Sequence, residues 1–161
     1  MLDLLFNNPL SFLIFIISLL IAVDIHEFAH AWMADKLGDP TPRLNGRLTL
    51  NPLAHLDLLG TLALLIVHLG WGKPVPIDPY NLKNPRRDTA LISLAGPASN
   101  LILACLLGLL LKIPLITQLL SFSVIFFYPI IVLNVSLAIF NLLPIPPLDG
   151  SKILLGFLPK D

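Results

Sequence analysis

The stretch IAVDIHEFAHAWMADKLG, residues 21–38, begins as an apolar helix and then carries ionisable side chains. It contains two of the chain's four histidines, His26 and His30, and the only glutamate, Glu27, lies between them. An ionisable group inside a bilayer is costly and usually serves a function. The stretch therefore predicts a membrane-spanning helix that carries a chemical site.

The composition of the whole chain is typical of a membrane protein. Of its 161 residues, 56% are hydrophobic and 12% are charged, and the mean hydropathy is +0.86. Ordinary soluble domains are less apolar than this. The formal net charge is zero, so no basic surface for nucleic acid is expected. We expect a single domain over residues 1–161 whose partner is the lipid bilayer.

The ends and the cysteine content of the chain add two expectations. Cys105 is the only cysteine, which excludes an internal disulfide and a cysteine-based zinc site. The N-terminal MLDLLFNN has an acid but no Lys or Arg, so it lacks the cationic start of a secretory signal. The first hydrophobic segment is therefore expected to belong to the mature structure.

Hydrophobic segments predict how often the chain crosses the membrane. A crossing helix needs about 20 apolar residues, and the chain offers three such segments, residues 10–34, 89–111 and 119–143. A fourth segment, residues 56–72, is shorter and is interrupted by Gly and His. Lys and Arg in short loops stay on the cytoplasmic side, and with three crossings every Lys and Arg except Lys112 lies on one side. We therefore expect three core transmembrane helices and a short re-entrant helix at 56–72.

A region rich in Pro and Gly connects the first two spans. Asn45-Gly46 lies between TPRL and RLTL, and this dipeptide is favoured in the two-residue turn of a β-hairpin. We therefore expect a small β-hairpin over residues 41–50. The complete fold class predicted is an all-α polytopic membrane protein with this hairpin region added.

The histidine pair has the spacing of metal ligands. Residues four apart lie on one face of a helix, so the imidazoles of His26 and His30 can reach one divalent ion. Glu27 points about 100° away from His26 and can contact a water molecule without binding the metal, as a general base must. The alternative is a pair of buried histidines that only form hydrogen bonds.

A catalytic zinc site takes about three protein ligands and a water molecule, so a third ligand is required. Asp149 is the best placed, because Pro144, Pro146 and Pro147 end the helix of the third span and Gly150 permits a turn. The other candidates for this position are Asp24, His55, Asp57 and His68.

HEFAH in the first span, together with NLLPIPPLDG after the last, resembles the site-2 protease family of intramembrane zinc metalloproteases. GRLTLNPLAHLDLLGT, GWGKPVPIDP and ISLAGPASN resemble its short branch, which has no PDZ or CBS domain, so the resemblance covers nearly the whole chain. It implies that His26, His30 and Asp149 hold one zinc ion per chain and that Glu27 activates water.

The resemblance also implies partners and a location. The substrate would be a membrane protein that is cut in or near a transmembrane segment. The enzyme would lie in the membrane of a prokaryotic cell, and its site would open toward the cytoplasm. Asn141, eight residues before Asp149, would assist the substrate carbonyl, although a hydrogen bond between helices is an equal alternative. Family members generally continue with another hydrophobic helix, whereas this chain ends twelve residues after Asp149. We therefore expect a truncated chain or an unusually small member.

Three further interpretations concern other segments and other functions. In GPASN, residues 96–100, the small residues favour close helix packing, and Asn100 is expected to bond to a neighbouring element. The edge of the 41–50 hairpin, or residues 75–77, could hold an extended substrate by strand addition. The alternative functions are a metal-ion transporter or channel, in which intramembrane His and Asp line an ion path, and an inactive relative that binds membrane helices.

Overall fold

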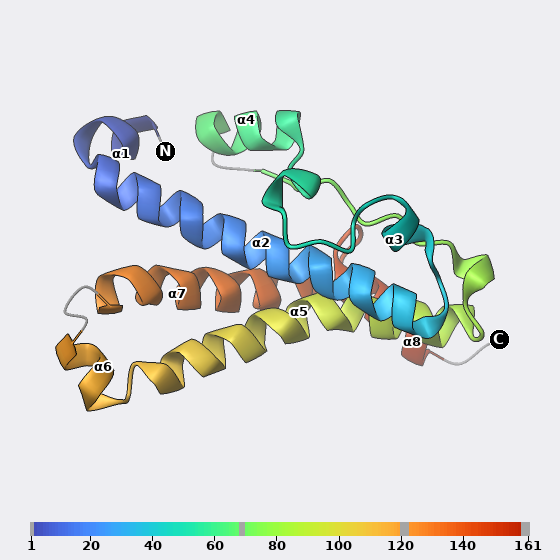
Figure 1. Ribbon diagram of the computed structural model, residues 1–161. Helices are drawn as coiled ribbons and strands as arrows, with labels where there is room; N and C mark the ends of the chain where they lie inside the picture. Colours follow the sequence, from blue (N-terminus) through green and yellow to red (C-terminus); the bar gives the residue numbers. More distant parts are fainter. Residues whose placement is uncertain (1, 68–69, 120–122, 159–161) are drawn as a thin grey trace.

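The computed structural model describes residues 2–67, 70–119 and 123–158, and three long helices dominate it (Figure 1). These helices, α2 (Pro9–Leu37), α5 (Pro85–Leu110) and α7 (Ser123–Asn141), are each long and apolar enough to cross a membrane, and each packs against the other two. The shorter elements are α1 (Leu2–Asn7), α3 (Thr41–Leu44), η1 (Pro52–Ala54), α4 (Leu58–Val67), η2 (Pro79–Asn81), α6 (Pro114–Leu119) and α8 (Asp149–Phe157). No β-sheet forms among the residues described, so the all-α prediction is confirmed.

The three predicted spans correspond to α2, α5 and α7, with ends that differ by a few residues. Asn8 caps the start of α2 by accepting a hydrogen bond from the Ser11 backbone N–H at 3.1 Å. The C-terminal ends of α2 and α7 lie on the same side of the molecule as the start of α5 (Figure 1). This arrangement brings the motif of the first span close to the segment that follows the third.

The packing between the spans uses mostly small residues, while most large apolar side chains face outward. The buried apolar residues of the three helices include Ala22, Ala31, Ala34, Ala104 and Ala138. In contrast, many Leu, Ile and Phe side chains along the same helices are exposed. Small residues let helices approach closely in lipid, and an apolar outer surface suits a hydrocarbon environment. The distribution therefore supports a membrane protein.

Helix α4 is too short to cross a bilayer. Its ten residues extend about 15 Å, half of the hydrocarbon thickness of about 30 Å. The segment that follows folds back on it, because Leu56 and Gly72 form an antiparallel bridge. A Cβ at Gly60 would lie 2.1 Å from the Trp71 carbonyl oxygen, so this return needs a glycine. That 56–72 does not form a full span is consistent with the structure, whereas its re-entrant position in a bilayer stays a prediction.

The prediction of a β-hairpin over residues 41–50 is wrong. Thr41–Leu44 forms the short helix α3, and Asn45-Gly46 ends that helix. A type I′ turn needs positive φ at both residues, but φ is −89° at Asn45 and 68° at Gly46. The Arg47 N–H donates to the Pro42 carbonyl at 2.8 Å and the Gly46 N–H to the Arg43 carbonyl at 3.0 Å. This is the Schellman pattern of a helix C-terminus, so strand addition at this edge loses its basis.

Asp39 holds this region in place. Its side chain is fully buried and accepts hydrogen bonds from the Thr41 backbone N–H at 3.0 Å, the Asn81 side chain at 2.9 Å and the Asp78 backbone N–H at 2.8 Å. Burial alone would raise the pKa of the Asp39 carboxyl, but these hydrogen bonds outweigh it and the pKa lies below its ordinary value. Asp39 thus joins the loop after α2 to the loop before α5.

The segment between α7 and α8 reverses the chain. Three prolines follow the end of α7 and cannot continue a helix, and α8 begins at Asp149. A Cβ at Gly150 would lie 2.3 Å from the Leu142 carbonyl oxygen and 2.4 Å from that of Leu143. Glycine at this position therefore lets the first turn of α8 lie against the end of α7, and α8 packs along α5.

Candidate metal centre

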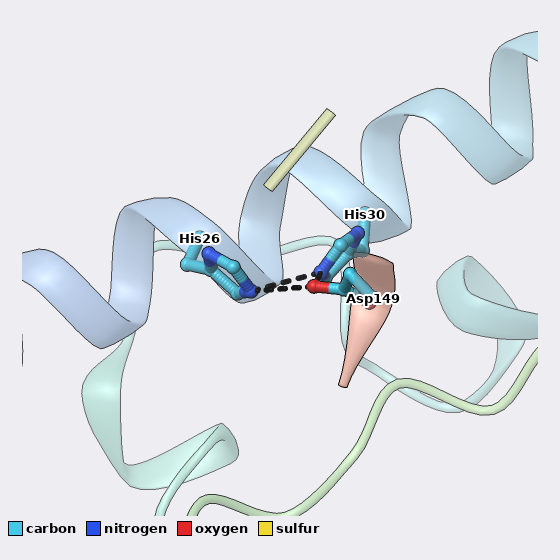
Figure 2. A group of neighbouring side chains, drawn as sticks. All are labelled: His26, His30 and Asp149. Carbon is cyan, nitrogen blue, oxygen red and sulfur yellow. Dashed lines mark hydrogen bonds and ion pairs between the residues drawn. The ribbon is translucent and has the colours of Figure 1, made fainter. Parts of the chain in front are cut away.

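Helix α2 places two imidazoles side by side. His26 and His30 are one helical turn apart, both are buried, and their Nε2 atoms are 3.0 Å apart (Figure 2). Their rings meet edge to face, with centroids 4.6 Å apart. The shared face predicted from the spacing is therefore confirmed.

Asp149, from the first turn of α8, completes the group. Its Oδ2 atom lies 3.1 Å from Nε2 of His26 and 3.2 Å from Nε2 of His30 (Figure 2). Three potential metal ligands thus converge from helices far apart in the sequence.

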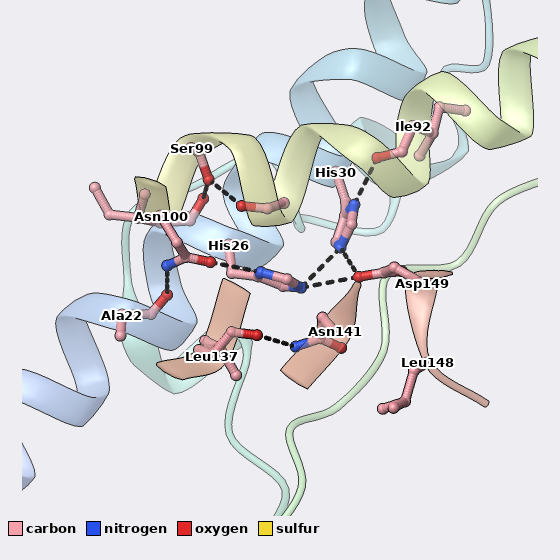
Figure 3. A network of polar contacts seen from close by, with 12 residues as sticks. Ala22, His26, His30, Ile92, Ser99, Asn100, Leu137, Asn141, Leu148 and Asp149 are labelled. Carbon is pink, nitrogen blue, oxygen red and sulfur yellow. Dashed lines mark hydrogen bonds and ion pairs between the residues drawn. The ribbon is translucent and has the colours of Figure 1, made fainter. Parts of the chain in front are cut away.

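The Nδ1 atom of each ring contacts an oxygen atom of α5. Nδ1 of His26 lies 2.7 Å from Oδ1 of Asn100, and Nδ1 of His30 lies 2.7 Å from the Ile92 carbonyl oxygen (Figure 3). Both partners are acceptors, so each Nδ1 carries the proton and each neutral ring keeps a lone pair on Nε2. In this tautomer, two lone pairs and a carboxylate oxygen face one another, an arrangement that a shared cation would stabilise.

The spacing of these three atoms suits zinc. Tetrahedral zinc with bonds of about 2.0–2.1 Å holds its ligand atoms about 3.3 Å apart. The three separations here are 3.0, 3.1 and 3.2 Å, so a small expansion of the triangle accommodates the ion. Three protein ligands of type N, N and O leave one position for water or substrate, as in catalytic zinc sites.

Helix α5 lies directly against the two imidazoles, and Gly96 is the residue at the point of contact. A Cβ on Gly96 would lie 2.5 Å from Nε2 of His30 and 2.7 Å from Cε1 of His26. Only a residue without a side chain allows this approach, so Gly96 has a role beyond general helix packing. The role was not evident from the sequence, because the spacing of GPASN does not reveal which helix it faces.

Asn100 and Asn134 form a buried amide chain behind His26. The Asn100 side chain donates to the Ala22 carbonyl at 2.9 Å and to Oδ1 of Asn134 at 2.7 Å, and Asn134 donates to the Ile130 carbonyl at 2.8 Å. These contacts orient the Asn100 amide so that its oxygen faces His26 (Figure 3). The expected bond from Asn100 to a neighbouring helix is confirmed, and its partner is a histidine of the cluster. Amides in apolar helices were the only sequence signal of this network.

A cavity of about 420 Å³ opens beside the cluster, between α2, α4 and α7. His26 and the half-buried Glu27 line one part of it. The remaining wall is mainly apolar and includes Ile16, Leu19, Leu20, Val23, Leu64, Leu137 and Phe140. Glu27 therefore borders a mainly apolar space next to the cluster.

Asn141 also lines this cavity. Its side chain donates to the Leu137 carbonyl one turn earlier, at 3.1 Å (Figure 3). The position is compatible with a role beside the substrate, but the observed bond is within its own helix. A contribution to an oxyanion remains a prediction, as do the catalytic role of Glu27 and the ligand roles of the cluster.

The other candidates for the third ligand have different partners among the residues described. Asp24 and His55 are both buried, and the closest pair, Nε2 of His55 and Oδ1 of Asp24, is 3.5 Å apart. Asp57 accepts a hydrogen bond from the Gly60 N–H at 2.8 Å at the start of α4. His68 lies outside the described residues. Asp149 is thus the acidic side chain that meets the histidine pair.

Comparison with known proteins agrees with this geometry. Residues 114–160 match the sequence pattern of Peptidase family M50. The chain is 43% identical over 159 residues to "Putative zinc metalloprotease YwhC" of Bacillus subtilis, covering 94% of this chain and 72% of that protein. It is 35% identical over 154 residues to "Putative zinc metalloprotease MJ0611" of Methanocaldococcus jannaschii, covering 92% and 75%.

This chain covers a smaller share of a further relative. "Putative zinc metalloprotease Rip2" of Mycolicibacterium smegmatis is 39% identical over 153 residues, which are 89% of this chain and 58% of that protein. No solved structure matches. The metalloprotease names and the cluster of two histidines and an aspartate point to the same chemistry, and the extent of the similarity confirms the resemblance drawn from the sequence. The chain belongs to peptidase family M50, the site-2 protease family.

Proposed function

We propose that this protein is an intramembrane zinc metalloprotease that hydrolyses peptide bonds in or beside the transmembrane segments of membrane proteins. The observation that carries the proposal is the convergence of His26, His30 and Asp149 next to Glu27, in helices long and apolar enough to cross a membrane. The names of the relatives support a zinc metalloprotease. The adjacent apolar cavity supports a membrane-embedded substrate.

Each residue of the site would have a distinct role in catalysis. His26, His30 and Asp149 would hold one zinc ion, which when bound lowers the pKa of water to about 7 and polarises a carbonyl. Glu27 would take a proton from the attacking water and pass it to the leaving amine. Asn100 and the Ile92 carbonyl would keep both imidazoles in the tautomer that ligates through Nε2.

The substrate would need to unfold locally. A helical substrate keeps its carbonyls in hydrogen bonds, so the scissile bond must leave the helix before attack. The apolar cavity would receive the side chains that flank this bond, and Asn141 would lie close to the carbonyl. Residues 75–77, which belong to no helix in the structure, would hold the extended chain by strand addition.

The distribution of cations supports an orientation for the site. The start of α5 and the ends of α2 and α7 share one side of the molecule (Figure 1), and Lys36, Lys83, Arg86 and Arg87 lie at these helix ends. Because Lys and Arg in short loops favour the cytoplasmic side, we propose that the site faces the cytoplasm. The relatives in Bacillus subtilis and Methanocaldococcus jannaschii support the membrane of a prokaryotic cell. Helix α4 would be re-entrant from that side.

The decisive experiment uses the full chain purified in detergent, a defined transmembrane peptide as substrate, and the variant Glu27→Gln. The wild type should contain about one zinc per chain and cleave the peptide. Glu27→Gln should retain zinc but cleave about 10²- to 10⁴-fold more slowly, because a general base contributes about that much. Removing zinc with a chelator should abolish cleavage, and adding zinc back should restore it.

A matched control is Asp35→Asn, an acid-to-amide change on the same helix at a residue that pairs with Arg43 at 3.3 Å. This control should cleave like the wild type. Cleavage that Glu27→Gln leaves intact would contradict the proposed mechanism. Absence of cleavage combined with metal flux across proteoliposomes, unaffected by Glu27→Gln, would instead indicate a transporter.

A further inference from the structure

A second cavity lies where the C-terminal end of α2 meets the segment that enters α5. Its volume is about 410 Å³, and three cationic side chains line it, Lys36, Lys83 and Arg87. Lys36 is in the last turn of α2, and Arg87 is in the first turn of α5. The metal ligands and Glu27 are not part of its lining.

Within the part of the chain that the structure describes, no carboxylate pairs with these three cations. Asp88 also lines the cavity, but it is buried and its Oδ2 accepts a hydrogen bond from the Asn84 backbone N–H at 2.9 Å. The cavity therefore keeps an excess of positive charge.

The same cavity has an apolar part. Leu37 and Leu91 line it beside the cations, at the ends of two helices that are long and apolar enough to span a membrane. Lys36 also lies over the ring of Trp32, with Nζ 5.9 Å from its centre, and such an aromatic is typical of the membrane–water interface. Cations above an apolar surface at this level match a phospholipid, whose phosphate adjoins its acyl chains.

We propose that this cavity binds the phosphate group of an anionic phospholipid. Lys36, Lys83 and Arg87 contact the phosphate oxygens, and Leu37 and Leu91 contact the start of the acyl chains. The apolar lining favours a lipid over free phosphate, which would gain nothing from the two leucines. Since Lys36 is six residues beyond His30, about 9 Å along the helix, the bound lipid joins the ends of α2 and α5 near the metal centre.

Lipid retention tests the proposal independently of any protease activity. The full chain in detergent is mixed with equal amounts of phosphatidylglycerol and phosphatidylcholine, and the lipids that remain bound are counted by native mass spectrometry. Each cation near the headgroup contributes about fivefold in affinity, so phosphatidylglycerol should be preferred by about tenfold or more. The triple variant Lys36→Gln, Lys83→Gln, Arg87→Gln should lose this preference.

The control removes as many charges elsewhere, with Lys73→Gln, Lys112→Gln and Lys152→Gln, and should keep the preference for phosphatidylglycerol. Lys36→Arg with Lys83→Arg, which retains the charges, should also keep it. Circular dichroism and size-exclusion chromatography check that each variant folds. Equal retention of both lipids by the wild type, or equal loss of preference in both triple variants, overturns the proposal. Equal thermal stabilisation by inorganic phosphate and by phosphatidylglycerol assigns the cavity to free phosphate and also overturns it.

Discussion

Two groups of buried histidine and aspartate share helix α2, yet they differ in geometry. In the first group, the potential ligand atoms of His26, His30 and Asp149 lie within 3.2 Å of one another. In the second, Nε2 of His55 is 3.5 Å from Oδ1 of Asp24, and that oxygen has no hydrogen-bond partner among the described residues. The residue types are the same, so they do not by themselves distinguish a metal centre from a structural contact.

The outer hydrogen bonds distinguish the two groups. Both histidines of the cluster use Nδ1 toward an acceptor of α5, which leaves Nε2 free to ligate. His55 does the reverse, since its Nε2 lies 3.0 Å from the Thr49 carbonyl oxygen, and its buried Nδ1 has no hydrogen-bond partner within the described ranges. A contact to a carbonyl makes Nε2 the protonated atom, so this nitrogen of His55 has no lone pair for a metal ion.

Among variants that separate the two groups, Gly96→Ala is expected to have the largest effect on the cluster of His26, His30 and Asp149. The new Cβ would lie 2.5 Å from Nε2 of His30, so α5 or the imidazole must move, and overpacking of this kind costs about 1–3 kcal/mol. We expect loss of most of the bound zinc and a lower unfolding temperature. Zinc content by mass spectrometry and thermal unfolding in detergent measure both effects.

Gly108→Ala on the same helix is the matched control. A Cβ there meets nothing within 4 Å, and Ala favours a helix over Gly by about 1 kcal/mol. This variant should bind zinc normally and unfold at the same or a higher temperature. Full zinc occupancy in Gly96→Ala would show that α5 does not hold the imidazoles in place.

Asn100→Leu should produce the next largest effect. It removes the acceptor for Nδ1 of His26 while keeping a similar volume, and loss of such a partner typically lowers metal affinity about 10- to 100-fold. Competition with a calibrated zinc chelator measures this affinity. Asn100→Asp retains an acceptor and should recover most of it, which a purely structural role would not predict.

Ser99→Ala serves as the neighbouring control. The Ser99 hydroxyl donates to the Gly96 carbonyl at 2.7 Å and makes no contact with a ligand side chain. Its zinc affinity should equal that of the wild type. If Asn100→Leu and Ser99→Ala bind zinc equally well, the amide chain behind His26 has no influence on the site.

The smallest effect is expected in the second group, with Asp24→Asn. The Asp24–His55 contact is loose, so the change should alter the free energy of unfolding by about 1 kcal/mol or less and leave zinc affinity unchanged. Chelator competition and denaturant titration test this together. A tenfold loss of zinc affinity would mean that the two groups are coupled rather than separate.

The sequence predicted the three long helices, because continuous apolar segments of sufficient length must cross a bilayer as helices whatever surrounds them. It also predicted that His26 and His30 share a face, because the 3.6-residue period of a helix is local. Asn45-Gly46 was misassigned for a related reason. Positive φ at Gly46 suits both a hairpin turn and a helix C-terminus. In the structure the segment is helical, and the buried Asp39 accepts a hydrogen bond from the backbone N–H of Thr41, the first residue of that helix.

What the sequence by itself determined is the apolar class of the protein, its three long helices and the histidine pair on one helix, since each depends on residues close together in the chain. Only the tertiary structure decided the rest. Asp149 meets the pair because α7 ends on the same side as α2, Gly96 allows α5 to approach, and Asn100 accepts from His26. These contacts join residues more than 60 positions apart, and local preferences carry no information about such packing.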